Sequence, residues 1–123
     1  MGPSVDNFVL VIDDDESIRE FYQTIFDSYD ISVIICDSAK TGLIAFDEHE
    51  ISLVICDLVM PEMGGSQFLK ILREDRQSKI PFIIVSGHLT SESIAQCKEL
   101  GADLLIEKPI QVGFLFEKIS SLL

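Results

Sequence analysis

The stretch Phe8-Val9-Leu10-Val11-Ile12-Asp13-Asp14-Asp15 decides the fold, because it joins an apolar run directly to three carboxylates. A continuous run of Val, Ile and Leu is typical of a strand that is buried on both faces of a parallel sheet. Carboxylates this close together repel one another, and they ionise jointly only beside a metal ion or a basic group. The stretch therefore predicts a buried first strand that ends at a cation-binding site.

Apolar runs of similar length recur along the chain and alternate with helical patterns. The clearest helix carries apolar residues at three-and-four spacing between residues 18 and 26, with Asp15 as its N-cap. A later helix begins at Thr90 or Ser91 and stops at Gly101. The predicted strands are residues 8–12, 31–35, 53–56, 82–85 and 103–106, and the other predicted helices are about 38–48, 66–74 and 111 to the end.

Five repeats of strand and helix predict a single doubly wound α/β fold, in which one five-stranded parallel sheet carries helices on both faces. In such folds, ligands bind outside the carboxyl ends of the strands, near the point where the strand order reverses. The residues that end each strand are therefore the first candidates for function.

Length and composition limit the classes of protein that the chain can belong to. The 123 residues, 47% of them hydrophobic, suit one compact domain at residues 8–123 after a short N-terminal leader at 1–7. The formal net charge of −12 argues against direct binding of nucleic acid and favours basic protein partners or cations. No apolar run is long enough to cross a membrane, and the first residues lack a signal peptide pattern, so a cytoplasmic location is expected.

The cysteines and histidines do not form a recognisable site. Cys36, Cys56 and Cys97 are widely spaced and lie in or beside apolar segments, so we expect buried, reduced thiols and not a zinc or disulfide framework. His49 and His88 are isolated, and a solvated position in a loop or at a helix end is expected for each.

Polar residues follow four of the five predicted strands. Asp13 and Asp14 follow the first strand and Asp57 follows the third, while Ser86 and Lys108 come just after the fourth and fifth. Since all ends of a parallel sheet point the same way, these side chains are expected to converge on one edge. Their oxygens suit a hard cation such as Mg²⁺, and the lysine suits an anionic oxygen.

With these residues in place, the chain resembles the receiver domains of two-component response regulators from Phe8 to about Leu122. Four motifs carry the resemblance, each at a strand end: Val11-Ile12-Asp13-Asp14-Asp15, then residues 54–65 (VICDLVMPEMGG), then Ile84-Val85-Ser86-Gly87, then Glu107-Lys108-Pro109. Each motif alone is weak, and the four in this order are specific. The resemblance implies the flavodoxin-like receiver fold.

The resemblance also implies a role for each strand-end residue. Asp57 is the expected phosphoacceptor, whose carboxylate takes a phosphoryl group from a phosphohistidine to give an acyl phosphate. Asp13 and Asp14 are expected to position Mg²⁺, with Asp14, Asp57 and the backbone carbonyl of Val59 as the direct ligands.

After phosphoryl transfer, the family pattern assigns the remaining residues to the new phosphoryl oxygens. Ser86 matches the family's hydroxyl residue, and Lys108 matches its lysine, which often precedes a cis proline, here Pro109. Asp15 is assigned to capping the first helix. The implied partners are a sensor histidine kinase or a histidine phosphotransfer protein on one side, and a downstream protein or an output domain outside this chain on the other. Self-association into a homodimer is left open.

Two positions depart from the family pattern. Many receivers carry an aromatic residue three positions before the lysine as part of their switch, and Leu105 stands there instead. We therefore expect phosphorylation to draw Ser86 toward the site, but the signal to pass differently from the aromatic version across the fourth helix, fifth strand and fifth helix. Gly64 replaces a frequent aspartate, which is expected to loosen the loop without removing a catalytic group.

Two alternatives belong to other classes of protein. Asp13 and Asp15 fit the D-x-D pattern of haloacid dehalogenase-type phosphohydrolases, but Ser17 stands where that family usually has Thr or Val, and the chain has no cap insertion. A pseudo-receiver that binds partners without phosphorylation is the other alternative, although the complete set of acidic residues and Lys108 disfavours it. The leading prediction is a signalling module that turns over no external substrate.

Overall fold

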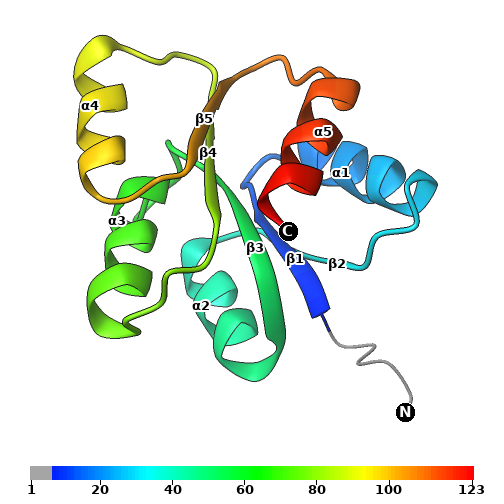
Figure 1. The fold of residues 1–123 in the computed structure, drawn as a ribbon, viewed down its shortest axis with the longest axis horizontal. Coiled ribbons are helices and arrows are strands. Elements are labelled where there is room, and N and C mark those ends of the chain that lie inside the picture. The colour runs from blue at the N-terminus through cyan, green and yellow to red at the C-terminus, as the bar shows by residue number, and fades with distance from the viewer. Residues whose placement is uncertain (1–6) are drawn as a thin grey trace.

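A computed structural model describes residues 7–123 and shows strands and helices in strict alternation (Figure 1). The predictions for residues 1–6 of the leader lie outside this part of the chain. The strands are β1 (Asn7–Ile12), β2 (Val33–Cys36), β3 (Glu50–Asp57), β4 (Phe82–Ser86) and β5 (Leu104–Glu107). The helices are α1 (Glu16–Ser28), α2 (Ala39–Glu48), α3 (Gly65–Lys70) with its π-helical continuation η1 (Ile71–Asp75), α4 (Ser91–Glu99) and α5 (Val112–Leu122).

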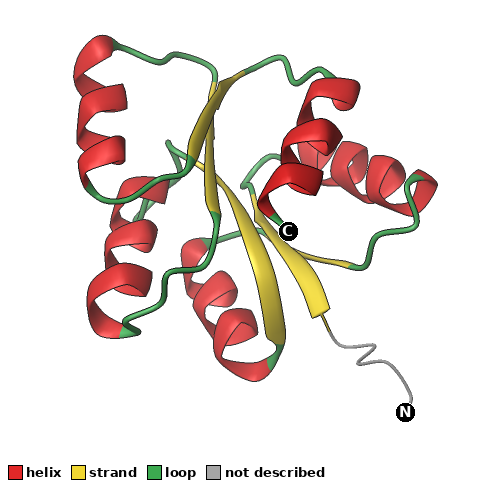
Figure 2. Ribbon diagram, viewed as in Figure 1, coloured by secondary structure: helices red, strands yellow, loops and turns green. Residues whose placement is uncertain are grey.

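The five strands form one parallel sheet in the order β2-β1-β3-β4-β5, with β3 at the centre. Helices α1 and α5 cover one face, and α2, α3 and α4 cover the other (Figures 1 and 2). The predicted doubly wound α/β fold is confirmed. The strand order reverses between β1 and β3, so the carboxyl ends of these two strands mark the expected ligand site.

The central strands of the sheet are buried on both faces because their inner positions are apolar. Along β1, Val9 and Val11 pack against α1 and α5, whereas Leu10 and Ile12 pack toward α2 and α3. All four side chains are at most 1% exposed. The alternation of side chains along a strand therefore supplies two apolar cores, which fix the ends of β1 and β3 in place.

Helix α1 begins and ends with local hydrogen bonds, of which the sequence predicts only those at its N-terminus. Asp15 is its N-cap, as predicted, and its Oδ1 accepts from the backbone N–H groups of Ser17 (2.8 Å) and Ile18 (3.2 Å). At the other end, Asp30 has a left-handed φ of 57°, and the N–H of Ile31 donates to the carbonyl of Phe26. This is a Schellman closure of the helix.

That closure explains why the predicted strand at residues 31–35 was wrong at its start. Ile31 is apolar because it packs against the core beside α1 after the helix ends, and strand β2 begins only at Val33. The fifth strand likewise begins at Leu104 and not at Asp103, whose carboxylate accepts from the backbone of Phe82. Apolar character alone does not separate a helix-end contact from a strand residue.

Helix α2 approaches the end of β1 closely at Gly42. A Cβ atom at this position would lie 2.5 Å from Cδ1 of Ile12 and 3.3 Å from Phe68. Only a residue without a side chain permits this approach, which packs the helix against the residue that precedes Asp13. Within residues 7–123, no helix is both long and apolar enough to cross a lipid bilayer.

Candidate phosphoacceptor and metal site

The carboxyl ends of β1, β3, β4 and β5 meet at one edge of the sheet. Ile12 pairs with Cys56 across β1 and β3, and Asp57 pairs with Val85 across β3 and β4. Asp13 and Asp57 are therefore neighbours although 44 positions separate them in the sequence. The parallel register is what brings distant carboxylates together.

Asp13, Asp14 and Asp57 form an acidic cluster in which one carboxylate oxygen from each lies within 4.8 Å of the others. Asp13 is 1% exposed and Asp57 is 8% exposed, whereas Asp14 is open to solvent. Two buried acids beside one exposed acid leave an approach for a hydrated cation. The oxygen set fits Mg²⁺, which binds one or two carboxylates and keeps several waters.

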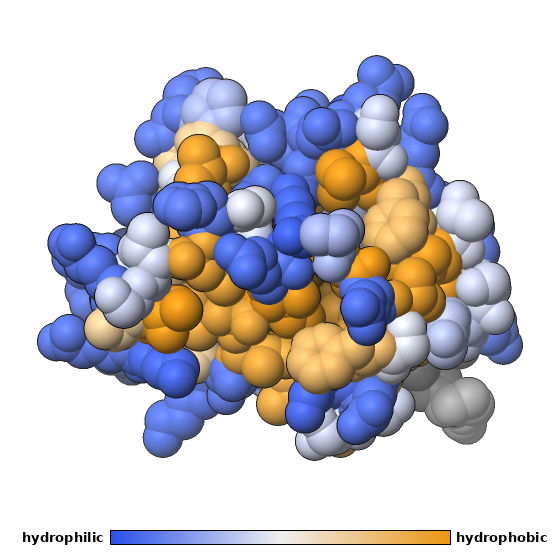
Figure 3. All heavy atoms as spheres, turned by 90° about the horizontal axis from the view of Figure 1, so that it is seen from above, coloured by the Kyte–Doolittle hydropathy of each residue, from blue (hydrophilic) through white to orange (hydrophobic). Residues whose placement is uncertain are grey.

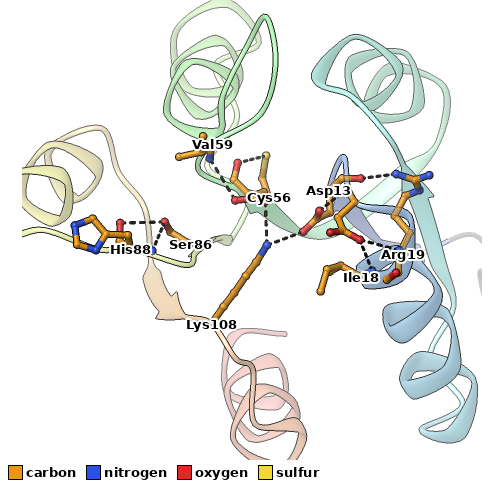
Figure 4. Close-up of polar contacts among 11 residues, drawn as sticks. Asp13, Ile18, Arg19, Cys56, Val59, Ser86, His88 and Lys108 are labelled. Atoms are coloured by element: carbon orange, nitrogen blue, oxygen red, sulfur yellow. Dashed lines mark hydrogen bonds and ion pairs between the residues drawn. The ribbon is translucent and has the colours of Figure 1, made fainter.

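Lys108 reaches into this cluster from the loop after β5 (Figure 4). Its Nζ donates to Oδ2 of Asp57 at 3.0 Å and to Oδ2 of Asp13 at 3.2 Å. The peptide bond between Lys108 and Pro109 is cis, as the resemblance implied. One ammonium group therefore balances two buried carboxylates.

The titration of these groups follows from burial and from their mutual contacts. Burial raises the pKa of Asp13, against the hydrogen bond from the Asp15 backbone N–H and the charge of Lys108, which lower it. Burial works against the Lys108 ammonium, but its hydrogen bond to Asp57 and the two carboxylate charges outweigh burial, so the pKa of Lys108 is raised. The site thus favours a proton or a cation near Asp13.

The loop after Asp57 is held tightly against the end of the sheet. The backbone N–H of Val59 donates to Oδ1 of Asp57 at 3.3 Å, and the N–H of Leu58 donates to the carbonyl of Val85 at 2.8 Å. A Cβ atom on Gly65 would lie 2.5 Å from the carbonyl oxygen of Asp57. Because Gly65 has no side chain, α3 can begin directly behind the candidate nucleophile. The Val59 side chain is 72% exposed beside the site.

Gly64 lies in the same tight loop, where a side chain would collide with the carbonyl of Leu58. The next residue, Gly65, donates its N–H to that carbonyl at 3.0 Å. The structure therefore gives Gly64 a packing role, and the predicted loosening of the loop stays a prediction about motion.

Ser86 lies at the end of β4 and is 2% exposed, but its hydroxyl is not directed at the carboxylates (Figure 4). Its Oγ donates to the carbonyl of His88 and accepts from the N–H of His88, both at 3.1 Å. The Ser86 hydroxyl is therefore near the predicted site but bonded to its own loop.

Leu105, which stands where many receivers have an aromatic residue, packs half-buried against the core on the α2, α3 and α4 side.

Asp15 and Arg19 lie beside the acidic cluster and contact the backbone around it. The Asp15 carboxylate caps α1, and the acidic cluster is formed by Asp13, Asp14 and Asp57 without it. Sequence reasoning missed Arg19, whose guanidinium donates to the backbone carbonyl of Asp13 at 3.1 Å. A basic residue four positions after a capping aspartate was the available signal.

The cysteines are all unpaired thiols, as predicted. Cys56 and Cys97 are buried, but Cys36 is only half-buried, which corrects the expectation of burial for all three. Cys56 directly precedes Asp57, and its Sγ donates to the backbone carbonyl of that residue at 3.4 Å. His49 and His88 are exposed, at a helix end and in a loop as expected.

A doubly wound α/β domain with three carboxylates and a lysine at its carboxyl edge belongs to the class of flavodoxin-like signalling modules. Within this class the chain belongs to the response regulator receiver domain family, whose pattern it matches over residues 9–120. The family is a signalling module of two-component systems and not an enzyme with an external substrate.

Individual relatives agree with this assignment. The chain is 30% identical to the transcriptional regulatory protein FixJ of Bradyrhizobium diazoefficiens over 92% of its own length and 55% of FixJ. It is 36% identical to the two-component response regulator ORR5 of Oryza sativa subsp. japonica, over 84% of this chain and 78% of that protein. The chain thus spans about half the length of FixJ.

Among solved structures, the fold is similar to that of a response regulator receiver protein from Pseudomonas putida. The TM-score is 0.90 at 26% identity, and the match covers 97% of this chain and 99% of the other.

Proposed function

We propose that this protein is a phosphoacceptor that receives a phosphoryl group on Asp57 from a phosphohistidine of a histidine kinase or a phosphotransfer protein. The observation that carries the proposal is the position of Asp57. Its two carboxylate oxygens are held by Lys108 and by the Val59 N–H, and Asp13 and Asp14 lie beside it. A carboxylate that is fixed on both oxygens is oriented for attack on an incoming phosphorus.

The proposed transfer makes one bond and breaks one. A carboxylate oxygen of Asp57 forms the new O–P bond while the P–N bond to the donor imidazole breaks, and the imidazole leaves with the electron pair and takes up a proton. The product is an acyl phosphate on Asp57. The later attack of water on phosphorus would restore the carboxylate and release phosphate, so the chain would catalyse only its own phosphorylation and dephosphorylation.

The acidic cluster would hold Mg²⁺ through Asp13, Asp14, Asp57 and the backbone carbonyl of Val59. When bound, the ion would offset negative charge on the phosphoryl oxygens. Lys108 already contacts Asp57 and would pair with a phosphoryl oxygen once that carboxylate is esterified. The residues present fit the ion because they supply oxygen ligands and one exposed approach at Asp14.

Ser86 would bind another phosphoryl oxygen, but only after it changes partner. Its one O–H currently donates to the carbonyl of His88. Donation to a phosphoryl oxygen requires that this bond break, which frees the loop between β4 and α4. The exchange would link the chemistry at Asp57 to the position of that loop.

An apolar hollow beside Lys108 supports a docking site for the phosphodonor. Ile18 and Phe21 of α1 line it together with Pro109 and Ile110 of the loop before α5. The face toward which the strands run carries apolar residues among hydrophilic ones (Figure 3). An amphipathic helix that bears the donor histidine fits this hollow, because its apolar side would bury these residues while the imidazole reaches the acidic cluster.

The proposed setting is the cytoplasm, and phosphorylation would alter the binding of a downstream protein or of an output domain. Acetyl phosphate with Mg²⁺ tests the chemistry directly. We expect a mass increase of one phosphoryl group that disappears in Asp57→Ala and persists in Asp15→Ala, whose carboxylate serves only the helix cap. Persistence of the adduct in Asp57→Ala would overturn the assignment, as would failure of acetyl phosphate and a panel of purified histidine kinases to label the native chain.

A further inference from the structure

Helix α4 has the fewest buried residues of the five α-helices in the described part of the chain. Cys97 is its only buried residue, whereas α1, α2, α3 and α5 each bury three. A helix with few buried contacts can be displaced at a small free-energy cost. The connections at its two ends, which Figure 1 shows at opposite ends of the helix, therefore decide how it moves.

The first connection joins α4 to the candidate phosphorylation site. Ser86 ends β4 and holds His88 through two hydrogen bonds of 3.1 Å. The next residue, Leu89, donates its N–H to the Glu107 carboxylate at 3.3 Å, and Thr90 then caps the helix. The first turn of α4 is thus joined to β4 through one hydroxyl, that of Ser86, and to β5 through the exposed Glu107 carboxylate.

The second connection is held by one guanidinium group. Nη1 of Arg73 donates to the carbonyl oxygens of Ser78 (3.1 Å) and Ile80 (2.8 Å). Its Nη2 donates to the carbonyl of Gly101 at 2.8 Å and forms an ion pair with Asp103 at 3.4 Å. The Arg73 side chain is 18% exposed. One residue of η1 thus binds both the loop before β4 and the turn that ends α4.

The surroundings of Arg73 make this attachment rigid. Gly101 has a left-handed φ of 100°, and a Cβ atom there would lie 3.0 Å from Nε of Arg73. The Asp103 carboxylate that pairs with Arg73 also accepts from the N–H of Phe82 at 2.8 Å, at the start of β4. The last turn of α4 is therefore tied to the sheet at the end farthest from Ser86.

We propose that Arg73 is a positioning residue that holds the turn after α4 in place, so that any displacement of α4 on phosphorylation of Asp57 is a pivot about this turn. The inference rests on the proposed function and adds a positioning role for Arg73. The reason is mechanical. Capture of the Ser86 hydroxyl releases His88 at one end of α4. At the other end, Arg73 binds the Gly101 carbonyl and the Asp103 carboxylate and is itself held by the carbonyls of Ser78 and Ile80. Leu105 supplies no phenol to transmit the change, so the loop and the pivot carry it.

Hydrogen exchange with and without beryllofluoride, a phosphoryl mimic, tests the pivot in the complete chain with Mg²⁺ present. We expect amides in residues 87–93 to change their exchange rates by about tenfold on addition of beryllofluoride, and amides in residues 97–102 to change far less. In Arg73→Gln, the amides of residues 97–102 should exchange faster in both states, and the beryllofluoride effect should spread along the whole helix.

The matched control is Arg76→Gln, which removes an arginine next to η1 that pairs with Asp47 at 2.8 Å and makes no contact with α4. It should keep the native pattern of exchange. Arg73→Lys keeps the charge but loses the forked geometry of the guanidinium. The beryllofluoride effect should spread along α4 in this variant too, but less than in Arg73→Gln. This variant keeps the proposal testable if Arg73→Gln fails to fold.

Equal changes at both ends of α4 in the native chain, with normal changes around Asp57, would overturn the pivot alone. An Arg73→Gln pattern identical to that of Arg76→Gln would overturn the role of Arg73. The absence of any beryllofluoride effect around Asp57 would overturn the proposed function and the pivot with it.

Discussion

Nζ of Lys108 lies 3.0 Å from Oδ2 of Asp57, so the candidate nucleophile carries an ion pair before any phosphoryl group arrives. The same ammonium lies 3.2 Å from Asp13. The lysine therefore occupies part of the electrostatic role that a divalent cation would take, and the two cations must share the cluster.

Lys108→Met should raise the affinity of the folded protein for Mg²⁺ by about tenfold, because it removes a positive charge that lies 3.0 Å from the Asp57 carboxylate and 3.2 Å from that of Asp13. The same change should lower the melting temperature without Mg²⁺, since it leaves Asp13 and Asp57 without their cation. Calorimetric titration and melting curves measure the two effects. Lys79→Met, at an exposed position, is the control and should change neither. Weaker Mg²⁺ binding by Lys108→Met would contradict the competition.

Mg²⁺ at millimolar concentration should raise the melting temperature of the native chain, because the ion binds the folded cluster and not the unfolded chain. Asp57→Asn removes one of the three carboxylates and should reduce this rise. A melting temperature that does not respond to Mg²⁺ in the native chain would argue against a metal site at this edge.

The buried Asp13 carboxyl predicts a pH dependence of stability in the Mg²⁺-free protein. Its folded-state pKa is raised above the ordinary 3.8, mainly by burial. A raised pKa means that the folded state holds this proton more tightly, so the stability it contributes at low pH is lost as the pH rises from below 3.8 through the raised value. Asp13→Asn should therefore gain stability relative to the native chain over that interval, as measured by urea unfolding. Parallel pH profiles would contradict this.

Gly42→Ala should destabilise the fold by about 1–3 kcal/mol, because its Cβ would collide with Ile12 in the core. Gly113→Ala is the matched control, since a Cβ there meets nothing within 4 Å. It should stabilise α5 by about 0.5–1 kcal/mol. Chemical denaturation of both variants gives the comparison, and similar effects of the two substitutions would refute the packing role of Gly42.

Alkylation under native conditions should modify Cys36 before the other two cysteines. Cys36 is half-buried, whereas Cys56 and Cys97 are buried and burial raises their pKa values, which keeps them as unreactive thiols. Burial also raises the pKa of Cys36, so the labelling should be slow. Peptide mapping after partial reaction with iodoacetamide identifies the residue, and early modification of Cys56 would contradict the burial order.

The sequence predicts which side chains lie together where local patterns determine their positions. Asp13, Asp57 and Lys108 directly follow or end apolar strands, and a parallel sheet necessarily gathers such ends at one edge. Asp15 follows the capping rule for the same reason, since its partners lie within three residues. The order of strands and helices is accessible from periodicity alone.

Features that depend on long side chains or on distant geometry could not be predicted in this way. Arg73 contacts residues up to 30 positions away, and nothing in its local sequence distinguishes it from the exposed Arg76. The π-helical turn at η1 and the engagement of Ser86 by His88 depend in the same way on how the loops pack. These partners are set by tertiary structure and not by spacing.

The position of β3 in the middle of the sheet limits which segments of the protein can deform. Asp57 ends this strand, whose last five residues are buried and whose neighbours on both sides are hydrogen-bonded to it. Such a strand opens only with the whole fold, so its mechanical compliance is small. If Asp57 is the phosphoacceptor, as we propose, strain from an acyl phosphate cannot relax within β3 and has to be taken up by the loops around it.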